Sequence, residues 1–232
     1  MVNGDTFRCR EGHQPETQSM NFDTAAYLRR ATGRAKSDVA NKLVSMFLHD
    51  VSRKLCGKLE LSVSDSRYVE GVSESFGGSC CYCGIELERD RAAVEHLDGM
   101  NRFRVGLHIP GNVIVSCTRC NREKRRDDSI PTLVLAETGW GSFLSHDGSK
   151  CGTACKSCIY WKQIWPEENE RIGNLRFAKE RIVTFRAKYA AYLEVNTKAR
   201  LKLAANIEAI YRDCQHFATT RIKEAVKEVC EN

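Results

Sequence analysis

The chain has 232 residues, a hydrophobic fraction of 42% and a net charge of +6 at pH 7. This length allows one large domain or two small ones with real cores, and no apolar run is long enough to span a bilayer. The first residues lack the basic-then-apolar order of a secretion signal, so we expect a cytoplasmic protein without membrane contact. The small excess of basic residues is compatible with a polyanionic partner but does not identify one.

Cysteine is the most informative residue type in the composition. There are 12 cysteines, and eight of them cluster at 80–83, 117–120 and 151–158. In a reducing cytosol, clustered cysteines indicate metal binding rather than disulfides. We expect the isolated cysteines to be small, buried, apolar side chains; they are Cys9, Cys56, Cys214 and Cys230.

The first stretch, residues 1–79, is predicted to be mainly helical. Apolar residues recur at helical spacing between 23 and 55, and we expect them to form the buried face; they are Leu43, Phe47, Val51 and Leu55. Gly77-Gly78-Ser79 closes the stretch as a flexible joint. The next stretch, residues 80–165, contains all of the clustered cysteines.

Within this central stretch, the pattern predicts a strand over 92–97, a loop over 98–111, a strand over 112–116 and a helix from Thr118 to about Arg126. The last stretch, residues 166–232, returns to helix. One face should be buried, formed by Leu175, Ala178, Ile182, Phe185 and Tyr189. The fold class is therefore α+β, a small core flanked by N- and C-terminal helices.

A second C-terminal helix is expected to follow Asn196-Thr197. Its apolar positions include Leu201, Ile207, Tyr211 and Cys214. The C-terminal flank is mildly basic, and its cations either contact DNA or form a solvated helix face; they are Arg176, Lys179, Arg186 and Lys188.

Two Cys-x-x-Cys pairs predict a zinc site. Cys80 with Cys83 and Cys117 with Cys120 can supply four thiolates in a tetrahedron. Cys81 is an alternative to Cys80, although the spacing favours Cys80. A second zinc is the other possible use of cysteine, with Cys151, Cys155 and Cys158 as three ligands.

The fourth ligand of that second site is open. His146 is the nearest candidate, and Cys9, His13 or Cys56 could reach the site only through the fold. Trp161 and Trp165 would cover such a site. Without a metal, the three cysteines would be buried thiols.

Residues 80–124 resemble the cysteine-rich branch of the HNH, or ββα-metal, nucleases. That branch has Cys-x-x-Cys, an acidic residue followed by His, a middle Asn, and then Cys-x-x-Cys-Asn. The matching positions here are the two cysteine pairs, Glu95-His96, Asn112 and Asn121. The resemblance implies a ββα-metal core pinned by zinc. It also implies that His96 is the general base, Glu95 and Asn121 bind a catalytic Mg²⁺ or Mn²⁺, and Asn112 braces the loop.

The chemistry agrees with these roles. Phosphodiester hydrolysis needs an activated water and a cation that neutralises the phosphate. Neutral imidazole accepts a proton near pH 7, and carboxylate and amide oxygens suit a hard divalent ion. Glu95 and His96 are neighbours on a strand, so one site for both requires a kink. Glu95 replaces a more usual Asp or His, Gly99 replaces a frequent Pro, and Asp98 is a less favoured ligand.

Five basic residues along the predicted helix could clamp phosphates beside this site, or they could form a solvated helix end. They are Arg119, Arg122, Lys124, Arg125 and Arg126. His108, in the loop, is expected to contact DNA or to be structural.

The function that follows is a metal-dependent endonuclease for double-stranded DNA, most simply a site-specific restriction enzyme that leaves 5′-phosphate and 3′-hydroxyl ends. The alternatives are a homing or phage HNH nuclease, a junction resolvase, or a non-catalytic zinc module that binds nucleic acid or protein. A palindromic target would imply a homodimer.

Overall fold

The computed structural model describes residues 24–128 and 139–231, and it describes side chains within 38–124 and 139–231. The chain divides into two units, residues 1–35 and 36–232. The first unit contributes only the beginning of one helix to the described residues. All sites discussed below lie in the second unit.

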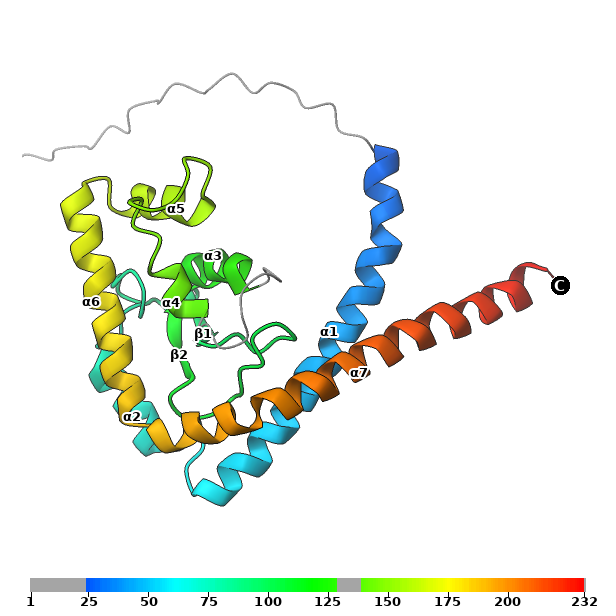
Figure 1. The fold of residues 1–232 in the computed structure, drawn as a ribbon, viewed down its shortest axis with the longest axis horizontal. Helices are drawn as coiled ribbons and strands as arrows, with labels where there is room; N and C mark the ends of the chain where they lie inside the picture. The colour runs from blue at the N-terminus through cyan, green and yellow to red at the C-terminus, as the bar shows by residue number, and fades with distance from the viewer. Residues whose placement is uncertain (1–23, 129–138, 232) are drawn as a thin grey trace, which may run out of the picture. The chain divides into compact units, whose positions relative to one another are not determined.

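The described elements are helices and one small sheet (Figure 1). In chain order they are α1 Thr24–Leu59, α2 Ser66–Phe76, β1 Ala92–His96, β2 Val113–Cys117, α3 Thr118–Asp128, α4 Gly139–Phe143, α5 Lys156–Ile164, α6 Glu168–Ala187 and α7 Ala190–Cys230. The protein is therefore α+β and mostly helical, as expected. No helix among these elements is both long enough and apolar enough to span a membrane.

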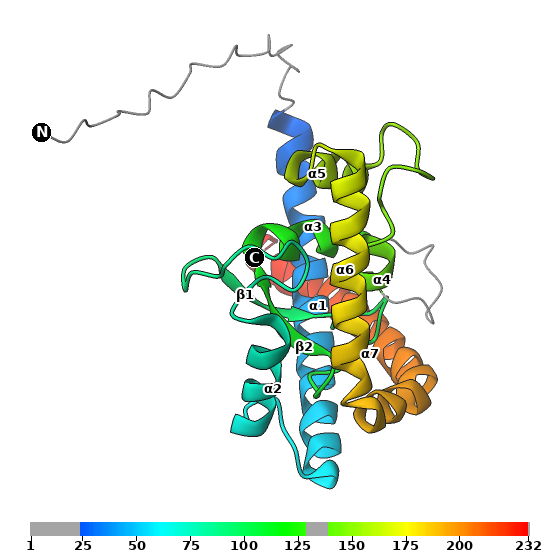
Figure 2. The same cartoon turned by 90° about the vertical axis from the view of Figure 1, so that its left-hand side faces the viewer.

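The two strands form an antiparallel pair in which Ala92 lies opposite Cys117 and His96 lies opposite Val113. The predicted strands and the following helix are confirmed to within a residue or two at each end. β2 runs directly into α3, and α3 packs against both strands (Figure 2). Val94 is exposed and Glu95 is buried, so the alternation of side chains along β1 turns Glu95 towards the protein interior.

Two hydrophobic clusters surround this sheet. The first combines side chains of α2, α4, α5 and α6 with the clustered cysteines 80, 81, 117 and 120. The second packs α1 and α7 around the loop that follows β1. Each cluster therefore contains residues from more than one of the three stretches, so the helical flanks share their cores with the central stretch.

The buried face of α1 differs from the prediction. Ala40, Val44, Leu48 and Cys56 are buried, whereas Leu43 is exposed and the rest of the predicted row is only partly buried. The true face is shifted by one residue, about 100° around a helix. The buried residues recur every fourth position along α1, and this row includes the polar residue Ser52. The burial of Ser52 is compensated by a hydrogen bond in which its hydroxyl oxygen accepts the backbone N–H of His108 at 2.9 Å.

The C-terminal helices are partly as predicted. Leu175, Ala178, Ile182 and Phe185 are buried on one face of α6. The expected break at Asn196-Thr197 is wrong, because α7 runs through it from Ala190 to Cys230. Thr197 donates its hydroxyl to the Leu193 carbonyl one turn back at 2.9 Å instead of capping a new helix.

Several single-residue expectations can also be compared with the structure. Among the apolar positions of the second C-terminal helix, Leu201 is exposed, whereas Ile207 and Cys214 are buried. Among the isolated cysteines, Cys56 is also buried, Cys230 is exposed, and Cys9 lies outside the described residues. The exposed Cys230 corrects the expectation that all four would be buried.

Candidate functional site

The first group of cysteines converges as the spacing predicts. The Sγ atoms of Cys80, Cys83, Cys117 and Cys120 all lie within 4.8 Å of one another. The Cys83 and Cys117 sulfurs are 3.9 Å apart, close to the edge of about 3.8 Å expected for a zinc tetrahedron with Zn–S bonds of about 2.3 Å. Cys81 is outside this group and fully buried, so the geometry selects Cys80.

Local backbone structure explains why the sulfurs meet. The first pair sits on a tight turn in which Gly84 donates its N–H to the Cys80 carbonyl at 3.0 Å and has a φ of 71°. The second pair spans the end of β2 and the first turn of α3, and the Cys120 N–H points at Cys117 Sγ, 3.4 Å away. Tyr160 of α5 places its hydroxyl 3.0 Å from Cys120 Sγ.

The four thiols differ in their electrostatics: the pKa values of Cys80 and Cys117 are lowered, whereas hydrogen bonds within the cluster, those with Cys117 first, raise the pKa values of Cys83 and Cys120. Hydrogen bonds from neighbouring thiols, Cys117 first, lower the pKa of Cys80. The hydrogen bond between the Cys117 and Cys120 side chains lowers the pKa of Cys117 to about 7. Metal coordination requires deprotonated sulfur, and two of the four thiols, Cys80 and Cys117, have lowered pKa values that favour this form. Together with the tetrahedral spacing, the donor set fits a zinc ion.

The second group also converges, and it includes His146. Its members are His146, Cys151, Cys155 and Cys158, again within 4.8 Å of one another. His146 Nδ1 lies 3.2 Å from Cys151 Sγ and 3.3 Å from Cys155 Sγ. Three sulfurs and one imidazole form a common structural zinc set, so this cluster too could hold a metal ion.

Other residues were also predicted to serve this second group, either as its fourth ligand or as its cover. Cys9 and His13 lie outside the described residues, and Cys56 belongs to the cluster around α1. The expected cover by Trp161 and Trp165 stays a prediction. Their rings stack on each other at 5.3 Å, and the Trp161 indole N–H donates to the Phe143 carbonyl in the first hydrophobic cluster.

Glu95 lies at the centre of a buried polar group. Its Oε2 accepts the Asn121 side-chain N–H at 2.8 Å. Its Oε1 accepts the Tyr82 hydroxyl at 3.2 Å and lies 2.7 Å from Lys124 Nζ. Lys124 also donates to the His96 carbonyl oxygen at 2.8 Å. Side chains from the turn between Cys80 and Gly84, from β1 and from α3 therefore meet at Glu95.

A small pocket brings the candidate catalytic residues together. Its volume is about 310 Å³, and its lining includes Glu95, His96, Asn121 and Lys124. Glu95 and His96 both line it although they are sequence neighbours, because His96 is the last residue of β1, where the chain leaves the strand. The four side chains bring a carboxylate, an imidazole, an amide and an ammonium group into one pocket.

Asn112 holds the loop between the strands. Its Nδ2 donates to the carbonyl oxygens of Asp98 at 3.0 Å and Leu107 at 2.8 Å. Its Oδ1 accepts the Asp98 N–H at 2.7 Å. This fully buried amide therefore ties the two ends of the loop together. It does not line the pocket, so any role in chemistry is through positioning.

Asp98 is engaged by the C-terminal helices. Its Oδ2 accepts a hydrogen bond from Arg186 at 3.0 Å, and Arg200 lies 3.9 Å away. Asp98 does not line the candidate pocket, which makes it a weaker candidate for a metal ligand than Glu95. Arg186 is thereby engaged in an ion pair inside the protein, so the solvated helix face is wrong for this residue, and its contact with DNA stays a prediction. Arg176, Lys179 and Lys188 are exposed on or just after α6.

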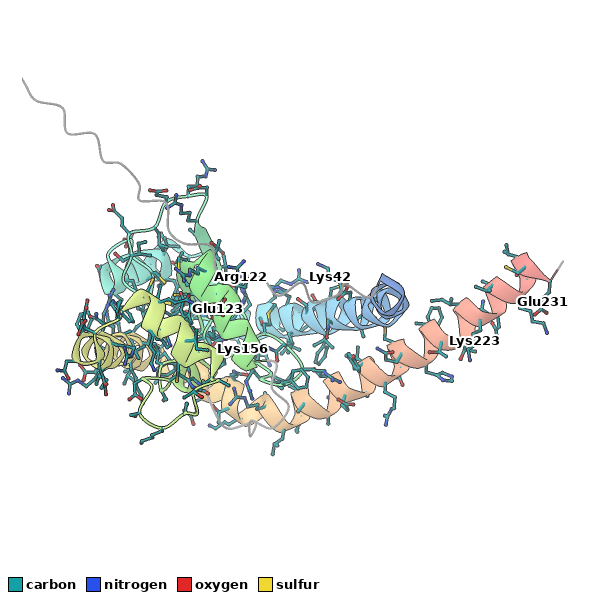
Figure 3. All side chains as sticks on the ribbon, turned by 90° about the horizontal axis from the view of Figure 1, so that it is seen from above. Lys42, Arg122, Glu123, Lys156, Lys223 and Glu231 are labelled. Carbon is teal, nitrogen blue, oxygen red and sulfur yellow. The ribbon has the colours of Figure 1, made fainter. Side chains whose placement is uncertain are left out.

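The basic residues of α3 divide into two kinds. Arg122 is exposed on α3 (Figure 3). Arg119 is exposed but lies against α5, with its guanidinium 5.1 Å from the centre of the Tyr160 ring. Lys124 is only 2% exposed, so it differs from the surface phosphate clamp expected from sequence. The side chains of Arg125 and Arg126 lie outside the described residues.

Sequence reasoning missed the partners of these residues. Tyr82 and Arg200 were not assigned a role, His108 was expected only to contact DNA or to be structural, and the burial of Lys124 was not foreseen. One signal was present: Lys124 follows Cys120 by four residues, so both lie on the same face of a helix. Comparisons with protein-family models, with curated proteins and with solved structures find no match to this chain.

Proposed function

We propose that the protein is a metal-dependent endonuclease of the HNH type that hydrolyses phosphodiester bonds of double-stranded DNA. The observation that supports this best is the shared pocket of Glu95, His96 and Asn121. It stands on a strand–loop–strand–helix unit whose helix begins between two clustered cysteines. This is the order and placement that the resemblance to the HNH family implies.

The donor atoms fit a hard divalent cation. Glu95 offers a carboxylate and Asn121 an amide; the Asn121 Nδ2 donates to Glu95 Oε2 at 2.8 Å, so Asn121 would bind a cation through its Oδ1 after rotation of the amide. Mg²⁺ usually keeps several waters and needs only one or two carboxylates from the protein. When bound, Mg²⁺ or Mn²⁺ would neutralise charge on the phosphate and stabilise the leaving oxygen. Lys124 would add a fixed positive charge beside the same carboxylate.

The proposed step uses His96 as general base. The imidazole takes a proton from water, and the water oxygen forms a bond to phosphorus. The bond from phosphorus to the 3′ oxygen breaks, and its electron pair stays on that oxygen, which is protonated from solvent. The products are a 5′-phosphate and a 3′-hydroxyl. No 2′-hydroxyl takes part, so DNA is a sufficient substrate.

We further propose that cleavage is site-specific, as in a type II restriction endonuclease, with a homing or phage nuclease or a junction resolvase as the alternatives. The small pocket is lined from α1, from β1 and the loop after it, and from α3, and exposed cations lie on α3 and α6. Base discrimination needs several contacts of about 1–3 kcal/mol each, and these flanks provide surface for them. A palindromic target would require a homodimer.

A second candidate is a zinc module that binds nucleic acid without cutting it. The observation in its favour is that Lys124 already neutralises the carboxylate that would bind the catalytic cation. Purified protein incubated with a sequenced phage DNA and Mg²⁺ distinguishes the two. Discrete, ligatable fragments that EDTA abolishes support a restriction endonuclease. A smear indicates a non-specific nuclease, and retarded but intact DNA favours the binding module.

The matched variant for this assay is His96→Ala. Removing a general base costs on the order of 10²–10⁴ in rate, while DNA binding should persist. His216→Ala is the control, because His216 is exposed on α7. Cleavage by His96→Ala at the wild-type rate would remove His96 from the proposed role.

A further inference from the structure

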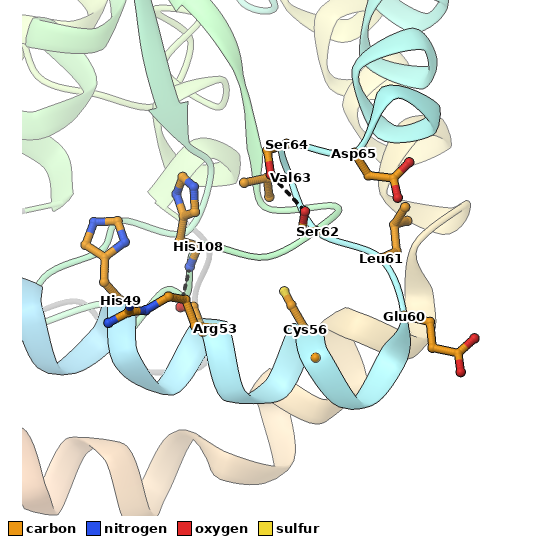
Figure 4. A pocket seen from close by; sticks show the side chains of 12 residues that line it. His49, Arg53, Cys56, Glu60, Leu61, Ser62, Val63, Ser64, Asp65 and His108 are labelled. Atoms are coloured by element: carbon orange, nitrogen blue, oxygen red, sulfur yellow. Dashed lines mark hydrogen bonds between the residues drawn. The ribbon is translucent and has the colours of Figure 1, made fainter.

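A second histidine contacts the candidate general base. His108 comes from the loop between the strands, and its Nδ1 is 2.9 Å from His96 Nε2. His96 lines the pocket that holds Glu95, whereas His108 lines a different pocket, of about 490 Å³, against α1 (Figure 4). His108 therefore contacts His96 from outside the candidate catalytic pocket.

The position of His108 is well determined by its neighbours. Its backbone N–H donates to Ser52 Oγ of α1 at 2.9 Å, and Ser52 is almost fully buried. The preceding carbonyl, that of Leu107, accepts the Asn112 side chain at 2.8 Å. His49 of α1 lies near the His108 ring, with the ring centroids 5.0 Å apart. Ser52 of α1 and Asn112, the residue before β2, therefore hold His108 in contact with His96.

The contact has a consequence for the protons of His96. Only one proton can lie between the two ring nitrogens, so one ring donates and the other accepts. If His96 donates from Nε2, its lone pair is on Nδ1, and the ring can act as a base there. If His108 donates instead, neutral His96 carries its proton on Nδ1 and cannot accept another at that atom.

We propose that His108 is a positioning residue that accepts the Nε2–H of His96 and holds it in the tautomer with a basic Nδ1. The catalytic consequence rests on the proposed function, whereas the tautomer can be tested without it. Burial, followed by the nearby His49, lowers the pKa of His108. A neutral His108 keeps an acceptor nitrogen, which a cationic ring lacks.

The direct test is long-range proton–nitrogen NMR of the imidazole rings in protein labelled with ¹⁵N-histidine, without added Mg²⁺. The His96 signals are identified by their loss in His96→Ala. We expect one neutral tautomer, protonated on Nε2, in wild type, and a mixture of both tautomers in His108→Ala. Protonation of wild-type His96 on Nδ1, or an unchanged tautomer in His108→Ala, overturns the proposal.

Two further variants separate this role from simple packing. His108→Asn keeps a polar atom near the position of Nδ1, whereas His108→Gln places its amide near the position of Nε2. His108→Asn should therefore retain the wild-type tautomer of His96 and His108→Gln should not. If both amides behave like alanine, the specific Nδ1 contact is wrong. Zinc content and circular dichroism verify that each variant is folded.

Cleavage kinetics provide the second readout. Loss of an outer partner of an active-site group typically costs about 10- to 100-fold, so kcat should fall by that factor in His108→Ala with KM nearly unchanged. His108→Asn should recover more activity than His108→Gln. If wild-type protein does not cut DNA, the proposed function fails, and the NMR result still decides whether His108 sets the tautomer of His96.

Discussion

Lys124 Nζ lies 2.7 Å from Glu95 Oε1, and both side chains are almost completely buried, at 2% and 3% exposure. The pair joins α3 to β1, and both residues line the candidate pocket. A buried ion pair is poor evidence for net stability, but removal of one partner leaves an uncompensated charge in the interior. The pair therefore makes the pocket sensitive to substitutions that change only one charge.

The first prediction concerns this pair. Lys124→Met should lower the free energy of unfolding of the zinc-loaded protein by about 3–5 kcal/mol, because Glu95 is left buried without its cation. The double variant Glu95→Gln/Lys124→Met should recover much of that loss. Denaturant titration measures both. Arg122→Met, on the exposed side of the same helix, is the control. A loss below about 1 kcal/mol in Lys124→Met would mean that the pair is not formed.

The second prediction uses two adjacent cysteines. Cys80→Ser should lose one zinc per chain, whereas Cys81→Ser should keep it, because only Cys80 lies within the group of four sulfurs. Cys155→Ser should lose a different zinc, so wild-type protein should contain two. Elemental analysis after gel filtration measures each ratio. One zinc in wild type would eliminate the site at His146, and full zinc in Cys80→Ser would eliminate the first site.

The third prediction concerns the catalytic cation. Asn121→Ala should weaken Mn²⁺ binding by removing one of the two proposed ligands, while the zinc content stays constant. Calorimetric titration with Mn²⁺ gives the affinity independently of activity. Asn206→Ala is the matched control, because that amide donates only to its own helix on α7. Equal Mn²⁺ affinity in wild type and Asn121→Ala would show that Asn121 is not a ligand.

The fourth prediction is a pH dependence. Burial holds the folded pKa of His108 below its ordinary value of 6.5. Below pH 6.5 the unfolded chain therefore binds a proton that the folded ring resists, and the free energy of unfolding falls as the pH is lowered. Between pH 7.5 and 6, His108→Asn should lose less stability than wild type. Parallel slopes for the two proteins would show that His108 does not contribute to this dependence.

The fifth prediction compares two arginines of α6. Arg186→Met should destabilise the fold by about 3 kcal/mol, since it leaves Asp98 buried with only the more distant Arg200. Arg176→Met should change stability by less than about 0.5 kcal/mol, as exposed positions usually do. If the exposed face of α6 contacts DNA, Arg176→Met also lowers DNA affinity, and a filter-binding titration measures this. Equal stability of the two variants would contradict the assignment of Arg186.

The local parts of the site could be read from the sequence. Cys-x-x-Cys spacing specifies a turn, and period-two alternation specifies a strand, so the first cysteine group and both strands are where they were expected. Long-range packing could not be read. The position of the buried face of α1 depends on the contact of Ser52 with His108, a loop residue more than fifty positions away. The burial of Lys124 depends on the packing of α3 against β1. Asn196-Thr197 resembles a helix start, but Asn196 is buried inside α7, near the beginning of that helix.

The supports of the loop between the strands have a practical consequence for protein engineering. This loop is held by Ser52 from α1, Arg186 from α6 and Asn112 at its own base. A fragment that contains only residues 80–124 lacks the first two supports, although it contains every residue of the family motif. Such a fragment is a poor choice for a transplantable module, and fusion partners should be joined outside the segment from α1 to α7.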